Sequence, residues 1–255
     1  MSQRTILITG GASGIGLGIA KHLGKQKHHI VLADINLDAA QNAAEQLEQQ
    51  GISASAIELD VTSPEAVESL PHRLKPLTID VLINNAGMQH VSKLEDFPAQ
   101  KWQLLVNIML VAPAMLSQAL LPSMRENNYG RIINIGSVHS VVASPYKSAY
   151  VAAKHGLLGF AKTLALETGD CDVTVNTICP AYVKTPMVEN QIAAQAIENG
   201  ISEQQVVDEI MLKPMPKKAF IEIEEIAAMA TFLMTDQAKN VTAQALVIDG
   251  GWTAR

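Results

Sequence analysis

The chain has 255 residues, of which 48% are hydrophobic and 17% are charged, and these values are typical of one globular domain with a large core. Its formal net charge of −6 argues against nucleic acid and against an anionic membrane as partners, because both attract basic surfaces. We therefore expect a small-molecule ligand, with no nucleic acid and no membrane involved.

The cysteine content and the N-terminus bear on where the protein works. Cys171 and Cys179 are the only cysteines, too few for a disulfide framework and without the CxxC spacing of a metal or redox site. We expect free thiols in a reducing compartment and no bound metal. The N-terminal MSQRTILITGG reaches glycine too soon for a signal peptide, and no apolar run approaches the roughly 18 residues of a membrane span. These features predict a cytoplasmic protein.

Short runs rich in β-branched residues alternate with longer segments of helical spacing along the chain. The runs that predict strands are 4–9, 28–34, 53–59, 79–84, 131–137, 172–178 and 244–249. Helical spacing is clear in 37–50 and 67–74. Several of the strands are apolar throughout, which is typical of a parallel sheet covered by helices on both faces. We predict a doubly wound, Rossmann-type α/β fold with a seven-stranded parallel sheet.

The chain shows no internal boundary. No linker rich in Gly, Pro or Ser divides it, so residues 1–255 are expected to form a single catalytic domain. One polar helical stretch, residues 187–216, lies between the sixth and seventh predicted strands. We expect it to form a small substrate lid.

A glycine-rich loop, TGGASGIG, follows the first predicted strand and precedes a helical segment. Gly10, Gly14 and Gly16 permit a tight turn and let a pyrophosphate approach the free N–H groups of a helix N-terminus. Three glycines alone are equally typical of a plain strand-to-helix turn. Asp34, however, ends the second strand 20 residues beyond Gly14, where its carboxylate can accept hydrogen bonds from an adenosine ribose. The same carboxylate would repel the extra phosphate of NADP, so the sequence favours NAD.

The stretch YKSAYVAAKHG contains two tyrosines and two lysines. On a helix, Tyr150 and Lys154 lie one turn apart on the same face, whereas Pro145 indicates that Tyr146 lies at the start of the helix. A phenol with a reference pKa of about 10 is a poor base at neutral pH. The positive charges of Lys154 and of an oxidised nicotinamide ring would favour the tyrosinate, so Tyr150 is predicted to remove an alcohol proton. Ser137, at the end of the fifth strand, would hydrogen-bond the same substrate oxygen.

The motifs TGGASGIG, NNAG (84–87), Ser137 and YVAAK follow one another in the order and spacing of the short-chain dehydrogenase/reductase family, which the whole chain resembles. The resemblance implies a catalytic tetrad in which Asn107, on an earlier helix, relays the proton through Lys154. The four residues are Asn107, Ser137, Tyr150 and Lys154. The cofactor site that it implies comprises Gly10, Ser13, Gly14, Ile15, Gly16, Asp34, Asp60, Val61, Asn85, Ala86, Gly87, Tyr150, Lys154, Pro180 and Val183. The chain departs from the family's usual Pro-Gly by having Ala181 after Pro180, and we expect the nicotinamide loop to tolerate this.

Within that family the chain is most similar to the soluble bacterial 3-hydroxybutyrate dehydrogenases, through NNAGMQHV, SVHS, the lysine before SAYVAAKHG, NQI and DGGW. The resemblance implies a small carboxylate held by two glutamines, a histidine and a lysine, which supply the charge-assisted donors that a desolvated carboxylate needs. The full set expected to bind substrate is Gln89, Ser137, His139, Lys147, Tyr150, Tyr182, Gln191 and Trp252. Taken singly, most of these residue types are usually exposed and solvated. Tyr182 stands where the resembled enzymes commonly have Trp, so slightly larger 3-hydroxy acids also fit the pattern.

These features predict NAD-dependent oxidation of (R)-3-hydroxybutyrate to acetoacetate and the reverse reduction, and the resemblance implies a homotetramer. One alternative is another NAD-linked short-chain reductase, acting on a polyol or a 3-oxoacyl thioester, in which Lys147 and His139 are merely solvated. A second alternative, from a different class, is a non-catalytic NAD-binding regulatory module. The intact tetrad argues against this module, because binding alone does not need Tyr150 and Lys154.

Overall fold

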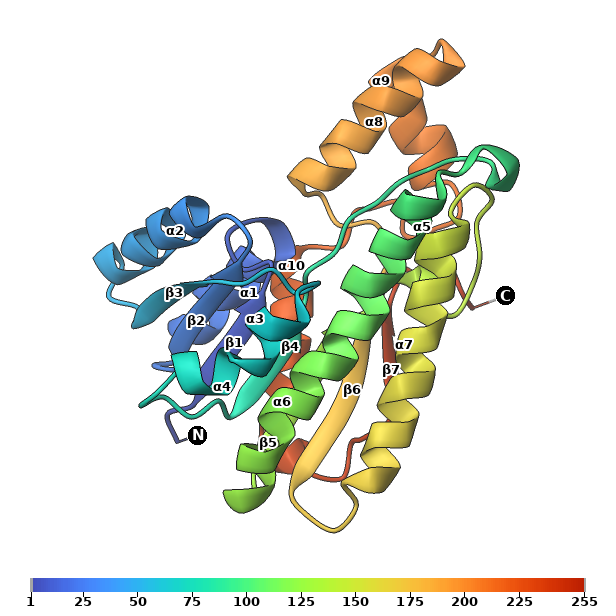
Figure 1. Cartoon of the computed structure of the whole chain (residues 1–255). Coiled ribbons are helices and arrows are strands. Elements are labelled where there is room, and N and C mark those ends of the chain that lie inside the picture. Colours follow the sequence, from blue (N-terminus) through green and yellow to red (C-terminus); the bar gives the residue numbers. More distant parts are fainter. Residues whose placement is uncertain (1, 255) are drawn as a thin grey trace.

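A computed structural model describes residues 2–254, except for the side chains of residues 187 and 198 (Figure 1). Its strands are β1 (Thr5–Thr9), β2 (His29–Asp34), β3 (Ala54–Glu58), β4 (Val81–Asn84), β5 (Gly130–Ile135), β6 (Val173–Pro180) and β7 (Ala245–Ile248). They form one sheet in the order β3-β2-β1-β4-β5-β6-β7, with every neighbouring pair parallel. Each strand overlaps one of the predicted strands, so the predicted fold class is confirmed.

Helices connect the strands. The α-helices are α1 (Gly14–Gly24), α2 (Leu37–Gln49), α3 (Pro64–Glu68), α4 (Leu70–Arg73), α5 (Ala99–Val106), α6 (Ala112–Glu126), α7 (Ser148–Glu167), α8 (Pro186–Asn199), α9 (Glu203–Gln205) and α10 (Ile223–Leu233). Short 3₁₀ turns occur at η1 (Leu94–Asp96), η3 (Val138–Ser140) and η5 (Asp236–Ala238), and π-helical turns at η2 (Asn107–Val111) and η4 (Val206–Met211). The segment 67–74, which has helical spacing, is divided between α3, which ends at Glu68, and α4, which starts at Leu70. Pro71, in the first turn of α4, has no N–H with which to continue the earlier helix.

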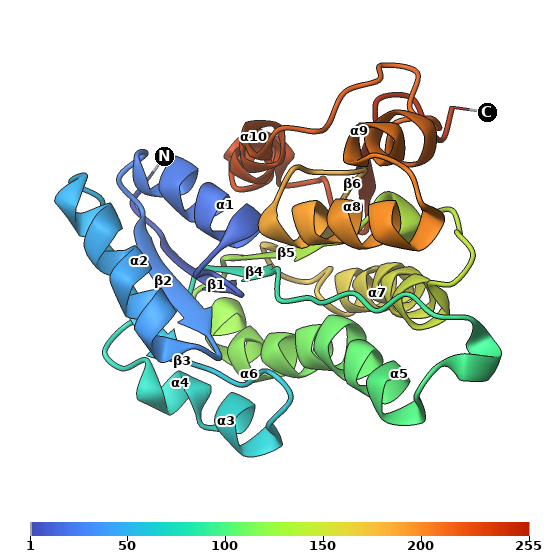
Figure 2. The same cartoon turned by 90° about the horizontal axis from the view of Figure 1, so that it is seen from above.

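The helices cover both faces of the sheet, as alternation along the strands requires. In β1, Ile6 and Ile8 face a core shared with α1, α2 and α10, whereas Leu7 faces a core shared with α3, α4, α6 and α7. Figure 2 shows these two helical layers on opposite sides of the sheet. Both faces of the central strands are therefore buried, which explains why apolar residues predominate in them, although β5 also buries Arg131 and Asn134.

One continuous helical segment, residues 99–126, is long and apolar enough to span a membrane by length and composition alone. It is made of α5, η2 and α6, and it lies against α7 on one face of the sheet (Figure 1). Core helices of soluble proteins pass the same test, so this segment is weak evidence for a membrane.

The strand order reverses at β1. From there the chain builds β2 and β3 on one side and β4 to β7 on the other, so the connections leave in opposite directions above the carboxyl ends of β1 and β4. In open parallel sheets, ligands bind in the crevice at this switch point. The fold thus predicts a ligand site above the carboxyl ends of β1 and β4.

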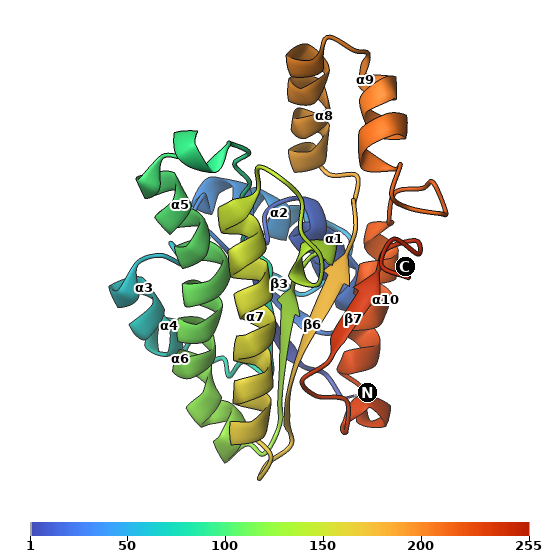
Figure 3. The same ribbon diagram turned by 90° about the vertical axis from the view of Figure 1, so that its right-hand side faces the viewer.

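The predicted stretch 187–216 is largely helical. Helices α8, α9 and η4 form an arm that stands above the carboxyl edge of the sheet, between β6 and β7 in the chain (Figure 3). The arm has a small core of its own, centred on Ile192, Val206 and Met211. Its contact with the rest of the molecule runs partly through Tyr182 and Phe220.

Gly16 illustrates how tightly the first turn of α1 meets its surroundings. A Cβ atom on Gly16 would lie 2.5 Å from the carbonyl oxygen of Gly10 and 2.6 Å from Nδ2 of Asn85. The backbone oxygen cannot move aside without distorting the glycine-rich loop. Gly159, in the exposed part of α7, has nothing within 4 Å of the same position.

We expect Gly16→Ala to lower the free energy of unfolding by about 1–3 kcal/mol, the usual cost of overpacking. Gly159→Ala is the matched control and should be neutral or stabilising by up to about 1 kcal/mol, because alanine favours the helix. Urea denaturation of the purified variants measures both. Equal stability of Gly16→Ala and the wild type would contradict the packing of the loop described above.

Candidate active site

Two adjoining cavities lie at the carboxyl edge of the sheet. The larger, of about 570 Å³, is lined by residues that follow β1, β2, β3 and β4, which is the switch-point crevice. The smaller, of about 110 Å³, lies between the turn after β5, the loop after β6 and helix α8. Tyr150 lines both cavities, so any reaction that joins two ligands would centre on it.

Most of the predicted cofactor residues come together around the larger cavity. Those lining it are Gly10, Ser13, Gly14, Ile15, Asp34, Asp60, Val61, Asn85, Ala86, Gly87, Tyr150 and Lys154. Pro180 and Val183 line the smaller cavity instead, because the loop after β6 turns toward α8. Gly16 lines neither, since its face is closed against Gly10 and Asn85. The structure thus gathers twelve of the fifteen residues around one cavity, and the cofactor roles of all fifteen stay predictions.

The larger cavity is suited to a dinucleotide. Gly10 and Gly14 have φ angles of 60° and 53°, in the left-handed region that favours glycine. A Cβ on Gly10 would approach the Cα of Ala86 to 3.0 Å, so any side chain there would crowd the cradle. Ser13 caps α1 without a hydrogen bond from its side chain, which leaves the first N–H groups of the helix free for an anion. These features match the phosphate-binding part of such a site.

A buried threonine, which the sequence did not single out, organises this cradle. The Oγ1 atom of Thr9 accepts the backbone N–H groups of Asn85 and Ala86 at 3.0 and 3.1 Å. The amide of Asn85 in turn donates to the carbonyl oxygens of Thr9 and Gly10 at 2.9 and 3.1 Å. The NNAG turn therefore fastens the end of β4 to the glycine-rich loop after β1.

Asp34 lies at the carboxyl end of β2, as predicted, and faces the larger cavity. Its Oδ2 atom accepts the N–H of Ala12 at 3.2 Å, and its Oδ1 atom accepts the N–H of Asn36 at 3.1 Å. Each carboxylate oxygen has a second lone pair, so Asp34 can still accept hydrogen bonds from a ligand. The next residue, Ile35, lines the cavity with a side chain that is 67% exposed.

Tyr150 and Lys154 lie on adjacent turns of α7, with the Lys154 Nζ atom 5.7 Å from the centre of the Tyr150 ring. Lys154 donates to the carbonyl oxygen of Ile135 at 2.6 Å, and its burial lowers its pKa to about 8. Burial raises the pKa of Tyr150, and a hydrogen bond with Ser137 partly opposes the rise. In this structure burial has the larger effect, so Tyr150 is a protonated phenol at neutral pH, ready to act as an acid.

Ser137 is held beside Tyr150 by the turn that follows β5. Its backbone is extended, its Oγ atom accepts the N–H of His139 at 3.1 Å, and its own N–H donates to Ser140 Oγ at 3.1 Å. This reciprocal capping fixes the hydroxyl group beside Tyr150, where its proton can turn from the Tyr150 oxygen to a ligand oxygen.

The structure does not bring Asn107 into either cavity. Asn107 lies where α5 passes into the π-helical turn η2, its side chain is exposed, and its carbonyl oxygen accepts the N–H of Ala112. Its neighbours Leu104 and Ile108 do line the larger cavity. Single π-turns within helices are common at functional sites, but the relay role of Asn107 stays a prediction.

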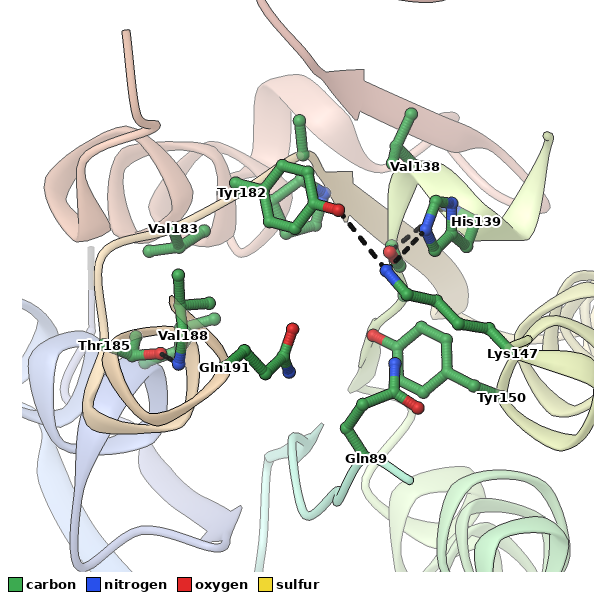
Figure 4. A pocket seen from close by; sticks show the side chains of 15 residues that line it. Gln89, Val138, His139, Lys147, Tyr150, Tyr182, Val183, Thr185, Val188 and Gln191 are labelled. Carbon is green, nitrogen blue, oxygen red and sulfur yellow. Dashed lines mark hydrogen bonds between the residues drawn. The ribbon is translucent and has the colours of Figure 1, made fainter. Parts of the chain in front are cut away.

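Seven of the eight predicted substrate residues surround the smaller cavity (Figure 4). They come from five segments of the chain and are Gln89, Ser137, His139, Lys147, Tyr150, Tyr182 and Gln191. The eighth, Trp252, lies behind this wall, stacked on Tyr182 at 5.9 Å between ring centres and edge-on to His139 at 5.7 Å. Trp252 therefore supports the wall of the cavity and does not line it.

Lys147 is the charged group of this cavity. Only 7% of the residue is exposed, and its Nζ atom lies 3.4 Å from His139 Nε2 and 3.3 Å from the Tyr182 hydroxyl. Burial lowers the pKa of Lys147, and burial together with the nearby Lys147 charge lowers the pKa of His139 to about 4. His139 is thus neutral at pH 7. Among the side chains that the structure describes, no carboxylate pairs with Lys147.

The position of Lys147 depends on an unusual backbone turn. Tyr146 has a φ angle of 66°, which is rare for a residue other than glycine, and α7 begins only at Ser148. The carbonyl oxygen of Tyr146 accepts the N–H of Ser92, which ties this turn to the segment after β4. Tyr146 itself is exposed and lines neither cavity, in agreement with the prediction that it does not share the role of Tyr150.

Several lining residues were not singled out from the sequence. In the larger cavity they are Ile35, Leu59, Thr62, Met88, Leu104, Ile108, Met109, Ile135, Gly136, Thr185 and Pro186, and in the smaller one Gly136, Val138, Thr185 and Val188. Most are apolar side chains at strand ends or on helices, where residue type alone gives no signal. Thr185 is different, because threonine before proline is typical of a helix start. It caps α8 through Val188 and lines both cavities.

Comparison with known proteins agrees with this geometry. A family model described as short chain dehydrogenase matches residues 4–196. The chain is 43% identical to a D-beta-hydroxybutyrate dehydrogenase of Rhizobium meliloti, covering 99% of each protein. It is 40% identical to the protein of the same name from Cupriavidus necator, covering 100% of each. A crystal structure of an actinorhodin polyketide ketoreductase variant with NADPH superposes with a TM-score of 0.94 at 30% identity, covering 99% of this chain and 98% of that one.

The match to the family model covers the glycine-rich loop, all the residues that line the two cavities, and the first part of α8. The two full-length relatives extend the likeness to the C-terminus. With a parallel sheet, a dinucleotide cradle and a Tyr–Lys pair between two cavities, the chain belongs to the short-chain dehydrogenase/reductase family of nicotinamide-dependent oxidoreductases.

Proposed function

We propose that the protein is an NAD-dependent dehydrogenase that interconverts (R)-3-hydroxybutyrate and acetoacetate. The observation that carries this proposal is Lys147, a buried cation without a carboxylate partner among the described side chains, beside the Tyr150 hydroxyl in a cavity of about 110 Å³. An uncompensated buried ammonium is costly, and an anionic ligand would offset that cost. A small acid with a hydroxyl or keto group two carbons from its carboxylate fits both requirements.

The family relatives support the same substrate. Two proteins that share 40–43% identity with the chain over their full length are named D-beta-hydroxybutyrate dehydrogenases. The structural neighbour, in contrast, is a polyketide ketoreductase, so a reductase for a larger keto substrate is the competing proposal. The smaller cavity, which we call the inner cavity, has a volume of about 110 Å³ and one buried lysine among its lining residues. Both features favour the short hydroxy acid.

Each side chain then has a definite task. A nicotinamide cofactor in the larger cavity supplies the acceptor for the hydride that leaves the alcohol carbon. Tyr150, in the tyrosinate form that a bound oxidised nicotinamide ring would favour, takes the alcohol proton, and in the reverse direction the phenol donates its proton to the ketone oxygen. Ser137 donates a hydrogen bond to that same oxygen, while Lys154, cationic below a pKa of about 8, stabilises the charged form of Tyr150. Lys147, with Gln89 and Gln191, would hold the carboxylate at the other end of the substrate.

We also propose that the enzyme is a homotetramer in the cytoplasm. Exposed apolar side chains support self-association: Val111 and Leu166 belong to η2 and α7, and Phe232 and Val247 belong to α10 and β7. Both cysteines are free thiols, which suits a reducing compartment. Sedimentation of the purified protein would distinguish a tetramer from a monomer of 27.4 kDa.

The first prediction of this proposed function concerns the cofactor. NAD should exceed NADP in kcat/KM by at least about tenfold, because the Asp34 carboxylate faces the position where a ribose hydroxyl or its phosphate would lie. Asp34→Ser should narrow this ratio by improving NADP and weakening NAD, and steady-state kinetics with both cofactors measures it. Equal kcat/KM for the two cofactors in the wild type would refute the preference.

The second prediction tests the substrate. Lys147→Ala should lower kcat/KM for (R)-3-hydroxybutyrate by about tenfold to a thousandfold, on the order of 1.4 to 4 kcal/mol, because the carboxylate loses its charged donor. The uncharged alcohol 2-butanol should lose much less. Lys162→Ala, at an exposed lysine within α7, should change neither.

The controls of this experiment separate the competing functions. An equal loss for both alcohols in Lys147→Ala, or no loss for either, would assign Lys147 a structural role and remove the support for a hydroxy acid. Faster NADH formation or consumption with a polyol or a 3-oxoacyl carrier thioester than with the hydroxy acid would favour the other reductases.

The third prediction concerns residues 187–216, which we propose to be the substrate lid. The small separate core of α8, α9 and η4 lets the arm move as a unit, and Gln191 and Val188 of α8 line the inner cavity. Amide hydrogen exchange in 187–216 should slow when NAD and acetoacetate, which cannot react with each other, are added together. NAD with 2-butanone should protect it less, and α2 should not respond. Unchanged exchange in the arm would exclude closure over the acid.

A further inference from the structure

Tyr182 combines a fixed ring with a hydroxyl group that points into the inner cavity. It lies in the loop after β6, and its ring stacks on Trp252 at an interplanar angle of 24° and a centre-to-centre distance of 5.9 Å. The hydroxyl oxygen lies 3.3 Å from Lys147 Nζ, and the two groups face each other across the top of the cavity (Figure 4). The stack fixes the direction of the ring, so the position of the hydroxyl group does not depend on a hydrogen bond that this group donates.

The direction of hydrogen bonding follows from the chemistry of lysine. An ammonium group has three N–H donors and no acceptor, so Lys147 donates and the Tyr182 oxygen accepts. The proton of Tyr182 is therefore free. Among the hydrogen bonds of residues 2–254, none uses that proton as donor. Burial raises the pKa of Tyr182, so the group remains a neutral O–H donor at neutral pH.

His139 has the opposite character. Lys147 also donates toward His139 Nε2 at 3.4 Å, which requires a lone pair on Nε2 and puts the ring proton on Nδ1. The Nδ1 atom is buried and has no partner among the described residues. In this arrangement His139 offers the inner cavity no donor, and it serves to position the lysine. Two of the three Lys147 donors are thus used, and the third is left for a ligand.

We propose that Tyr182 is a substrate-binding and specificity-determining residue, whose O–H donates to the substrate carboxylate while its oxygen holds the Lys147 ammonium group. This inference rests on the proposed function, because it needs an acid in the inner cavity. Lys147 and Tyr182 present two donors 3.3 Å from each other on one wall, suited to the two oxygens of one carboxylate. Gln89 adds a third donor, since its amide oxygen is already occupied by the N–H of His90 at 3.0 Å.

The test is Tyr182→Phe, which keeps the ring and its stack on Trp252 and removes only the hydroxyl group. We expect kcat/KM for (R)-3-hydroxybutyrate to fall tenfold to a hundredfold, mainly through KM, since the lost hydrogen bond is to a charged group. The methyl ester of the same acid, which has no carboxylate, should change by less than about twofold. The affinity for NADH, measured by fluorescence, should stay the same. Tyr146→Phe, at an exposed tyrosine outside both cavities, is the matched control and should match the wild type.

A pH profile distinguishes direct binding from a structural effect. When the ammonium group loses an acceptor, its charged form is less favoured, so the pH above which KM for the acid rises should move lower in Tyr182→Phe. Equal losses for acid and ester, or an unchanged profile, would leave the hydroxyl only a structural role and overturn the inference.

The same variants keep this inference separate from the function itself. If Lys147→Ala selectively lowers kcat/KM for the acid and Tyr182→Phe does not, the result supports the hydroxy-acid function and contradicts the proposed role of Tyr182. If the wild type has the same kcat/KM for the ester as for the acid, the result contradicts both the hydroxy-acid function and the role of Tyr182. In the double variant Lys147→Ala with Tyr182→Phe, the losses should be less than multiplicative, because Tyr182 acts partly through Lys147.

Discussion

All seven strands run in one direction, and this single constraint places the whole site. Each loop that follows a strand starts at the same edge of the sheet, so residues from 10 to 186 in the chain meet within one crevice. The reversal of strand order at β1 then separates the connections and opens room between them. Hydrogen bonds of Thr9 and Asn85 join the loops that follow β1 and β4, which are neighbouring strands of the sheet. A change that loosened this edge would affect both cavities at once.

The site contains two buried lysines that the protein treats differently. Lys154 is satisfied by a backbone carbonyl oxygen at the end of β5, and its position on α7 is fixed relative to Tyr150 by one helical turn. Lys147 precedes the helix, at a turn with a left-handed residue, and finds only a neutral imidazole and a phenol. Lys154 thus faces the larger cavity, whereas Lys147 faces the smaller one, where an anion would offset its charge. This difference separates the chemistry of the proton from the recognition of the substrate.

The two cavities meet at Tyr150, and the elements around them differ in rigidity. The larger cavity is built on strand ends and on helices packed against the sheet. The smaller one is closed on one side by the arm of α8, α9 and η4, which has its own core and few attachments. Under the proposed function, the cofactor side would be preorganised, and the proposed lid would let the substrate side open and close. This division suits an enzyme that must admit a small acid and then exclude water from it.

The sequence by itself determined the elements whose signals are local. Unbroken β-branched runs specify strands buried on both faces, the spacing of Tyr150 and Lys154 places them on one helical face, and Asp34 follows the second strand by position alone. Resemblance to the family added the set of residues around the inner cavity. These predictions succeeded because each depends on the chain's own periodicity or on an ordered motif.

Only the tertiary structure decided how side chains from distant segments meet. The contact of Lys147 with Tyr182 joins residues 35 positions apart, and spacing cannot indicate whether a side chain faces a cavity. Thus Asn107 is exposed and lines neither cavity, Gly16 closes against Gly10, and Trp252 supports the wall from behind. The break between α3 and α4 depends likewise on which backbone groups find partners. These side-chain positions depend on packing between elements that are distant in the sequence, so no local sequence pattern indicates them.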